Sequence, residues 1–389
     1  MRNPKRTRWH WRASALVASA ALVLAACGNG EDVADDEPDT DDVEETEEPD
    51  DDADDADDAE DDADADAEDD AEAAPDLEQV GPITMGTIAT PPIFAMVLPN
   101  VAAEAGFFDK YNVDVELRPM ETGVDAARAV QGGDLEVAFS PTGPVMTFAG
   151  TGVDVAAIMG LDNIDWLVGS TNPDIAGCED LEGETIGVDS VGGARYSVLE
   201  IILDSCGLTT DDVDVAALPG AAAVQAVAAG QIDTSVVHID DLYVMEEEGA
   251  DSMEVAVFLA DVDPDQHYLV YWALQETLEG EDREALVRSL AAMIEATRFM
   301  NDEANEDEVV QIGTATGHSE EVVAQSLADF IDLEFWPVDR HGLPEGKIEA
   351  TIEEQVRLDN IPEGDAPAYE DVVDVELWEE AYDLVQSMD

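Results

Sequence analysis

The chain has 389 residues, of which 95 are acidic and 15 are basic, for a formal net charge of −80 at pH 7. A surface this acidic repels phosphate backbones, so the composition excludes a nucleic-acid-binding protein. The length leaves room for a leader, a linker and a body of two lobes.

The first 27 residues have the pattern of a bacterial export signal. Five basic residues precede an apolar stretch over 13–26, which is shorter than the ~20 apolar residues of a spanning helix. The sequence Leu24-Ala25-Ala26-Cys27 resembles the lipobox of bacterial lipoproteins, which implies cleavage before Cys27 and lipid attachment to its sulfur. We therefore expect a signal peptide over 1–26 and a mature protein lipid-anchored to the outer face of the cell membrane. A plain secretion signal with an incidental cysteine is the alternative.

Residues 27–78 combine Cys27 with a tract of Asp, Glu and Ala. Residues 31–76 contain 29 acidic residues and no Lys or Arg, so we expect a disordered, extended spacer. The body that follows still has 66 acidic residues against ten basic ones. Because molar salt screens such self-repulsion, we hypothesise a halophilic source.

From residue 79 onward, short β-rich segments alternate with helical ones, which predicts an α/β fold with mainly parallel sheets flanked by helices. The expected strands of the first lobe are 83–88, 113–118, 136–139 and 153–159. The expected helices between them are 93–104, 124–131 and 144–149. After Asn172-Pro173 the alternation restarts, with strands at 185–189, 213–218 and 234–239 and helices at 195–206 and 221–229.

The last third of the chain returns to the first lobe and is mostly helical. Strands are expected at 253–259 and 268–275, and apolar residues recur at i, i+4 spacing after Glu281, as they do on buried helix faces. We expect this helical tail to support the first lobe. The predicted lobes are 79–172 with 255–389 and 173–254, joined by a two-stranded hinge near 170–176 and 250–266.

Two further cysteines remain in the body, and an even pair outside the cell favours a disulfide. Cys178 precedes the strand at 185–189, and Cys206 ends the helix that follows it. Because that helix returns antiparallel to its strand, its end comes near the strand's start. Two separate buried thiols are the alternative.

Four segments, in this order, resemble the periplasmic binding proteins for nitrate, sulfonates, taurine and thiamine-pyrimidine precursors. They are residues 86–119, with Ala105-Gly106-Phe107-Phe108, then 127–144, 180–203 and 221–241. The resemblance implies a two-lobed binding-protein fold of type 2. It also implies a monomer that captures a small-molecule ligand between its lobes and delivers it to the membrane subunits of an ABC permease.

In open α/β sheets, ligands bind outside the carboxyl ends of the strands, so the loops after the predicted strands are the candidate ligand site. We expect this site to comprise Thr90, Pro92, Phe94, Thr122, Ser140, Thr142, Trp166, Ser190, Gly192, Gly193, Arg195, Tyr196, His238 and Asp240. Glycines at a helix start and Arg195 would suit an anion. Phe94, Trp166 and Tyr196 would suit an aromatic pyrimidine. Pairing of Arg195 with a surface acid is an equally open reading.

An enzyme is the main rival class. The chain has no GxSxG, HExxH, P-loop or GxGxxG motif, and the histidines of the body lack metal-ligand spacing. A related fungal enzyme makes thiamine pyrimidine with a lysine-bound cofactor and a cysteine-rich motif. Here neither Lys110 nor Lys347 falls in a predicted site loop, so we expect no catalysis, cofactor or metal. The preferred solute is a sulfonate-, taurine- or nitrate-like anion, with a pyrimidine precursor as the alternative.

Overall fold

The computed structural model describes residues 77–88, 93–120, 123–191, 194–218, 222–247, 249 and 253–388. The expected signal peptide, Cys27 and most of the acidic spacer therefore lie outside the described residues. Within the described ranges, every helix is too short or too polar to cross a bilayer.

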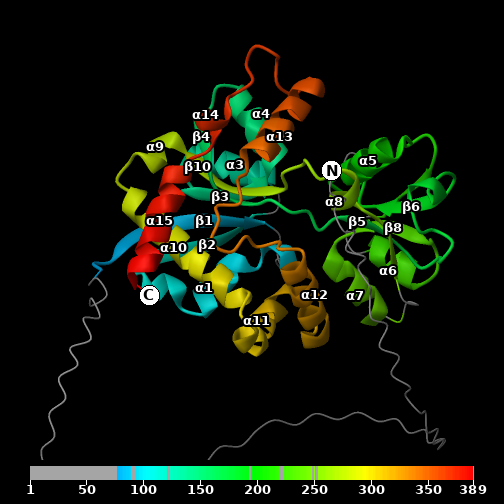
Figure 1. Cartoon of the computed structure of the whole chain (residues 1–389), viewed down its shortest axis with the longest axis horizontal. Helices are drawn as coiled ribbons and strands as arrows, with labels where there is room; N and C mark the ends of the chain where they lie inside the picture. Colours follow the sequence, from blue (N-terminus) through cyan, green and yellow to red (C-terminus); the bar gives the residue numbers. More distant parts are fainter. Residues whose placement is uncertain are drawn as a thin grey trace, which may run out of the picture. The chain divides into compact units, whose positions relative to one another are not determined.

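The first lobe is built on a five-stranded sheet with the order β2-β1-β3-β10-β4 (Figure 1). Strands β1, β2 and β3 are parallel, whereas β10 lies antiparallel between β3 and β4. The strands are β1 (Val80–Ile88), β2 (Val113–Met120), β3 (Val137–Pro141), β4 (Val155–Leu161) and β10 (Leu269–Leu274).

The helices of the first lobe connect its strands, as the alternating pattern predicted. They are η1 (Phe94–Met96), α1 (Leu98–Glu104), α2 (Phe107–Lys110), α3 (Gly123–Gly132) and α4 (Thr142–Gly150). The single helix expected over 93–104 is divided into η1 and α1. Pro99 lies in the first turn of α1, where its missing N–H and fixed φ are tolerated, so a new helix begins there.

The second lobe repeats the same strand order as β7-β6-β8-β5-β9, with β5 as the one antiparallel strand. Its strands are β5 (Leu167–Ser170), β6 (Thr185–Val188), β7 (Asp214–Ala217), β8 (Thr234–Val237) and β9 (Glu254–Phe258). Its helices are η2 (Cys178–Asp180), α5 (Ala194–Cys206), α6 (Ala222–Ala228), α7 (Ile239–Glu247) and α8 (Leu259–Val262).

The expected lobe boundaries at 172/173 and 254/255 were wrong. Strand β5 belongs to the second sheet, where it pairs with β8 and β9, and β9 also stays in that sheet. The chain therefore crosses between the lobes over residues 162–166 and, after α8, over residues 263–268. The second crossing overlaps the expected 250–266, whereas the first lies before the expected 170–176. The Asn172-Pro173 break is a turn inside the second lobe.

The helical tail comprises α9 (Gln275–Leu278), α10 (Arg283–Met300), η3 (Glu303–Asn305), α11 (Glu306–Gly313), η4 (Thr314–Thr316), α12 (Glu320–Asp332), α13 (Glu345–Arg357), α14 (Tyr369–Val372) and α15 (Val375–Met388). Helix α10 is buried along most of its length and packs against α1 and α15 of the first lobe. Helix α12 instead packs against α7 of the second lobe (Figure 1). The tail thus supports the first lobe, as expected, and also contacts the second.

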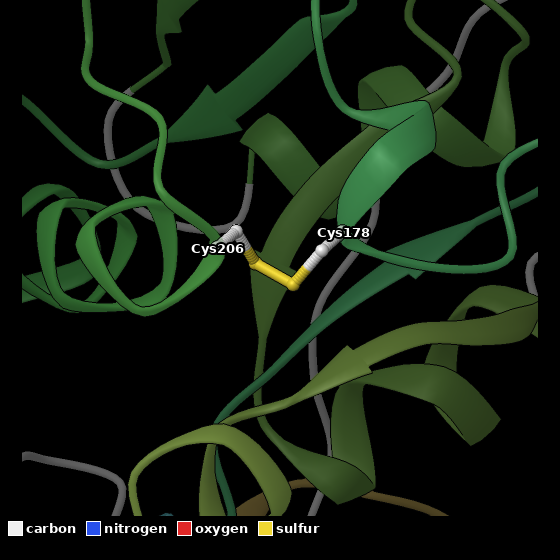
Figure 2. The surroundings of a disulfide bond; sticks show 2 residues. All are labelled: Cys178 and Cys206. Atoms are coloured by element: carbon white, nitrogen blue, oxygen red, sulfur yellow. A yellow bond between two sulfur atoms is a disulfide. The ribbon is translucent and has the colours of Figure 1, made fainter.

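Cys178 and Cys206 form a disulfide in the second lobe (Figure 2). Their Cα atoms are 5.3 Å apart, within the range that a disulfide needs. The bond fastens η2 to the last residue of α5, so both ends of the β6–α5 unit are tied together.

Candidate functional site

Both crossings between the sheets carry polar groups that are buried. In the first crossing, Asp162 and Asp165 are buried, and Asp165 is completely inaccessible to solvent. In the second crossing, His267 is buried and Tyr268 is half-buried. The first crossing leaves the carboxyl end of β4, the position at which α/β sheets bind ligands.

Asp165, Trp166 and His238 form one cluster beside the first crossing. His238 follows β8, and its Nδ1 lies 2.7 Å from Oδ2 of Asp165. The rings of Trp166 and His238 face each other with their centres 3.5 Å apart. Burial alone would lower the pKa of His238, but the charge and hydrogen bond of Asp165, together with Asp240 and Asp241, raise it above its ordinary value.

The second oxygen of Asp165 has no hydrogen-bond partner in the part of the chain that the structure describes. The hydroxyl of Tyr268 comes from the opposite crossing and interacts with Asp165 and Trp166. Burial, together with the charge of Asp165, raises the pKa of Tyr268 well above its ordinary value, so this hydroxyl stays protonated. The cluster therefore combines a buried acceptor and a hydroxyl with the aromatic pair of Trp166 and His238.

Arg195, the predicted anion ligand, is held by groups of its own lobe. Its guanidinium donates to the backbone oxygen of Val236 at 2.6 Å and to Oδ2 of Asp241 at 2.9 Å. The guanidinium carbon also lies 5.7 Å from the centre of the Trp166 ring, within cation–π range. Arg195 thus positions Trp166 and β8, and its charge is already balanced by a carboxylate.

Asp240 joins the second lobe to elements of the first. It is buried, accepts a hydrogen bond from the backbone N–H of Phe94, and lies 3.4 Å from Nε2 of His318. Burial would raise the pKa of Asp240, but the hydrogen bond from His318 and the charges of His238 and His318 lower it. The hydrogen bond and charge of Asp240 in turn raise the pKa of His318. Asp240 and His318 therefore form an ion pair between the two lobes.

The polar residues after β3 are engaged inside the first lobe. Thr142 contacts Nδ1 of His267 at 2.7 Å, and the other ring nitrogen of His267 lies 2.7 Å from the backbone oxygen of Gly342. Burial lowers the pKa of His267 to about 4, so this ring is neutral at physiological pH. Ser140 accepts the indole N–H of Trp272 at 2.7 Å.

The remaining predicted site residues are placed as follows. Phe94 is fully buried against Phe330 and Trp336, so it is a core residue and not an exposed stacking wall. Tyr196 is half-buried on the core of the second lobe, and Ser190 is exposed. Thr90, Pro92, Thr122, Gly192 and Gly193 lie outside the described residues.

Asp165, Tyr268 and His318 were not among the predicted site residues. Asp165 is one acid among 95, so its type carried no signal, and its importance depends on the unrecognised strand β5. His318 was dismissed for lack of metal spacing. Among the described residues, no group of three His, Cys, Asp or Glu is placed to hold a metal ion.

Two sheets of equal strand order, joined by two crossings, define the two-lobed periplasmic-binding-protein fold. The "NMT1/THI5 like" family model matches residues 97–306, which is just over half of the chain. The protein therefore belongs to the NMT1/THI5-like family.

Similar proteins share this fold. The curated protein "Putative binding protein BAB2_1146" of Brucella abortus is 25% identical over 231 residues, 59% of this chain and 70% of the relative. The aliphatic sulphonate binding protein SsuA from Escherichia coli is 16% identical, with a TM-score of 0.57 over 75% of this chain and 91% of SsuA. The nitrate-binding protein NrtA from Synechocystis PCC 6803 is also 16% identical, with a TM-score of 0.59 over 81% and 92% of the two chains. At these identities the structures show a common fold.

Proposed function

We propose that this protein is the extracytoplasmic solute-binding component of an ABC importer and that its solute is a small nitrogen-bearing aromatic molecule. The observation that carries the solute class is the buried Asp165 carboxylate. One of its oxygens contacts His238, and the other, near the Tyr268 hydroxyl, has no hydrogen-bond partner that meets geometric criteria among the described residues. A buried acceptor without a partner is costly, so an N–H donor on a solute would relieve that cost. The solute's ring would then lie against the aromatic pair formed by Trp166 and His238.

A thiamine-pyrimidine precursor has the required aromatic ring and amino donors. A sulfonate- or nitrate-like anion, which the sequence favoured, is the second candidate and is supported by the fold shared with SsuA and NrtA. The described cluster suits an anion poorly. Its cationic groups already have carboxylate partners: Arg195 pairs with Asp241, and the two histidines His238 and His318 pair with Asp165 and Asp240.

The delivery route is also proposed. Lipid on Cys27 would hold the receptor at the membrane, and the acidic tract would give the folded lobes reach toward the permease. We propose a monomeric, non-catalytic receptor.

A thermal-shift screen in high salt tests the solute class. A bound solute raises the melting temperature by mass action. We expect an aminopyrimidine bearing a hydroxymethyl group to raise it, and nitrate, taurine and alkanesulfonates to leave it unchanged. A rise with an alkanesulfonate that Arg195→Ala abolishes would instead establish the anion as the solute.

A further inference from the structure

Helix α13 contacts both crossings between the lobes. Lys347, Thr351 and Glu354 are spaced at i, i+4 and i+7 and therefore lie on one face of the helix. Ile348 and Ile352 lie on a neighbouring face and are buried in the core of the first lobe. Helix α13 is thus fixed to the first lobe and presents three polar side chains to the crossings.

At the first crossing, the contacts come from Lys347 and from the segment before α13. The ammonium of Lys347 donates to the backbone oxygen of Asp162 and lies 3.5 Å from Oδ1 of Asn163. Arg340 reaches Oδ2 of Asp162 at 3.4 Å. The body has only two lysines, and burial lowers the pKa of this one, so its position is not an ordinary surface site.

At the second crossing, the contacts come from Thr351 and Glu354, the next two residues on the same helix face. The backbone N–H of His267 donates to Oγ1 of Thr351 at 3.4 Å. The Gln266 amide donates to the two oxygens of Glu354 at 3.2 and 3.1 Å. Thr351 also donates to the backbone oxygen of Lys347 at 2.9 Å, which links the two sets of contacts.

The loop before α13 lies directly against β4, the strand that leads into the first crossing. The backbone N–H of Gly160 in β4 donates to the oxygen of His341 at 2.8 Å. A Cβ atom on Gly160 would lie 2.2 Å from the backbone oxygen of Gly342, so only glycine permits this approach. The end of β4 is therefore fixed to the same segment that holds both crossings.

A cavity of about 330 Å³ separates part of the second crossing from α13. Half of its lining residues are acidic and come from both sides, namely Asp263, Asp265, Glu353 and Glu354. Because this volume is not filled by packed apolar groups, the second crossing can shift against α13 without breaking the hydrophobic core.

We infer that residues 340–354, here named the hinge clamp, couple the two crossings and set how far the lobes open. The inference rests on the proposed function only in taking lobe opening to serve solute exchange. The clamp itself acts in the solute-free protein. Because these contacts hold the crossings in the arrangement that the structure shows, removing one of them should shift the lobes away from that arrangement without affecting the fold of either lobe.

Single-molecule energy transfer between dyes on the two lobes tests this inference in full-length protein without solute. Dyes would be attached at Glu104→Cys and Glu182→Cys, both exposed, with Cys27→Ser to prevent labelling there. We expect Lys347→Met to change the ratio of open to closed molecules about fivefold relative to the wild type, as loss of one hydrogen-bond contribution would. Thr351→Val, a milder change, should act in the same direction.

Two matched variants separate clamping from general stability. Lys347→Arg keeps donors at the first crossing and should restore the wild-type distribution. Lys110→Met removes the other body lysine, which pairs with Glu295 inside the first lobe, and should leave the lobe distance unchanged. Wild-type distributions for both Lys347→Met and Thr351→Val, or an equal shift with Lys110→Met, would overturn the inference.

Discussion

At the scale of residues, the few basic side chains of the body all have assigned partners. Nine of the ten form ion pairs with Asp or Glu, and Lys347 donates to Asp162 and Asn163. In a body with 66 acidic residues, a cation finds a carboxylate within its own lobe. This explains why Arg195, placed correctly near the strand ends by the sequence, pairs with Asp241 and does not stand ready for an anion.

Asp329 provides a test of how burial of one carboxyl group makes stability depend on pH. It lies on α12 and accepts a hydrogen bond from Tyr243 of α7, and burial raises its pKa to about 6. The folded state therefore holds this proton more tightly than the unfolded state does, so stability should fall as pH rises from about 4 to 6. We expect Asp329→Asn to stabilise the protein by roughly 1 kcal/mol at pH 8, after allowance for partial exposure, and to change little at pH 4.

Urea unfolding across pH 4–8 would measure this effect. Glu363→Gln, at an exposed site, removes the same charge and serves as the control. If the free energy of unfolding of Asp329→Asn followed the same pH dependence as that of Glu363→Gln, burial of Asp329 would not be the cause.

At the scale of elements, the sequence predicted the parallel strands well and the lobe boundary poorly. Apolar runs bounded by turn residues located β1, β2, β6 and β8 within a few residues. Strand β5 has four residues and ends in Gly169-Ser170, so it carries little local signal. Its position depends on pairing with β8 and β9, about 65 to 90 residues away, which local patterns do not report. Because β5 was not predicted, the first crossing was placed too late in the chain.

The candidate site shows the same limit. The strand-end rule brought Trp166, His238 and Asp240 into the prediction, because it depends only on where strands stop. It could not supply Asp165 or His318. The first belongs to a crossing that was misplaced, and the second reaches Asp240 through the packing of α12 on α7, a tertiary contact.

The disulfide gives a prediction for the second lobe. Cys178 and Cys206 are 28 residues apart, so the bond should stabilise the folded state by roughly 3–4 kcal/mol in the chain-entropy model. The double substitution Cys178→Ser with Cys206→Ser should lower the melting temperature under non-reducing conditions. Addition of a reductant should lower the wild-type melting temperature toward that of the double variant. A double variant as stable as the wild type would contradict this account.

At the scale of the whole molecule, charge should dominate the response to salt. With 66 acidic residues against ten basic ones, the folded body repels itself at low ionic strength, and molar salt reduces the screening length to roughly 3 Å. We expect the melting temperature to rise steeply when NaCl is raised from dilute (about 0.1 M) to molar (about 2 M) concentration. A salt-independent melting curve would refute the proposed adaptation to high salt.

The central proposal is that this two-lobed protein recognises its solute through N–H groups that hydrogen-bond to Asp165. Calorimetric titration of the hydroxymethyl aminopyrimidine into wild-type protein and into Asp165→Asn, in high salt, tests this most directly. Asparagine keeps the size of the side chain but replaces one acceptor oxygen with a donor amide. We predict binding to the wild type and a loss of at least about tenfold in affinity for the variant, as expected when a charged hydrogen bond is removed. Equal affinity for both proteins, or wild-type binding of an alkanesulfonate alone, would contradict the account.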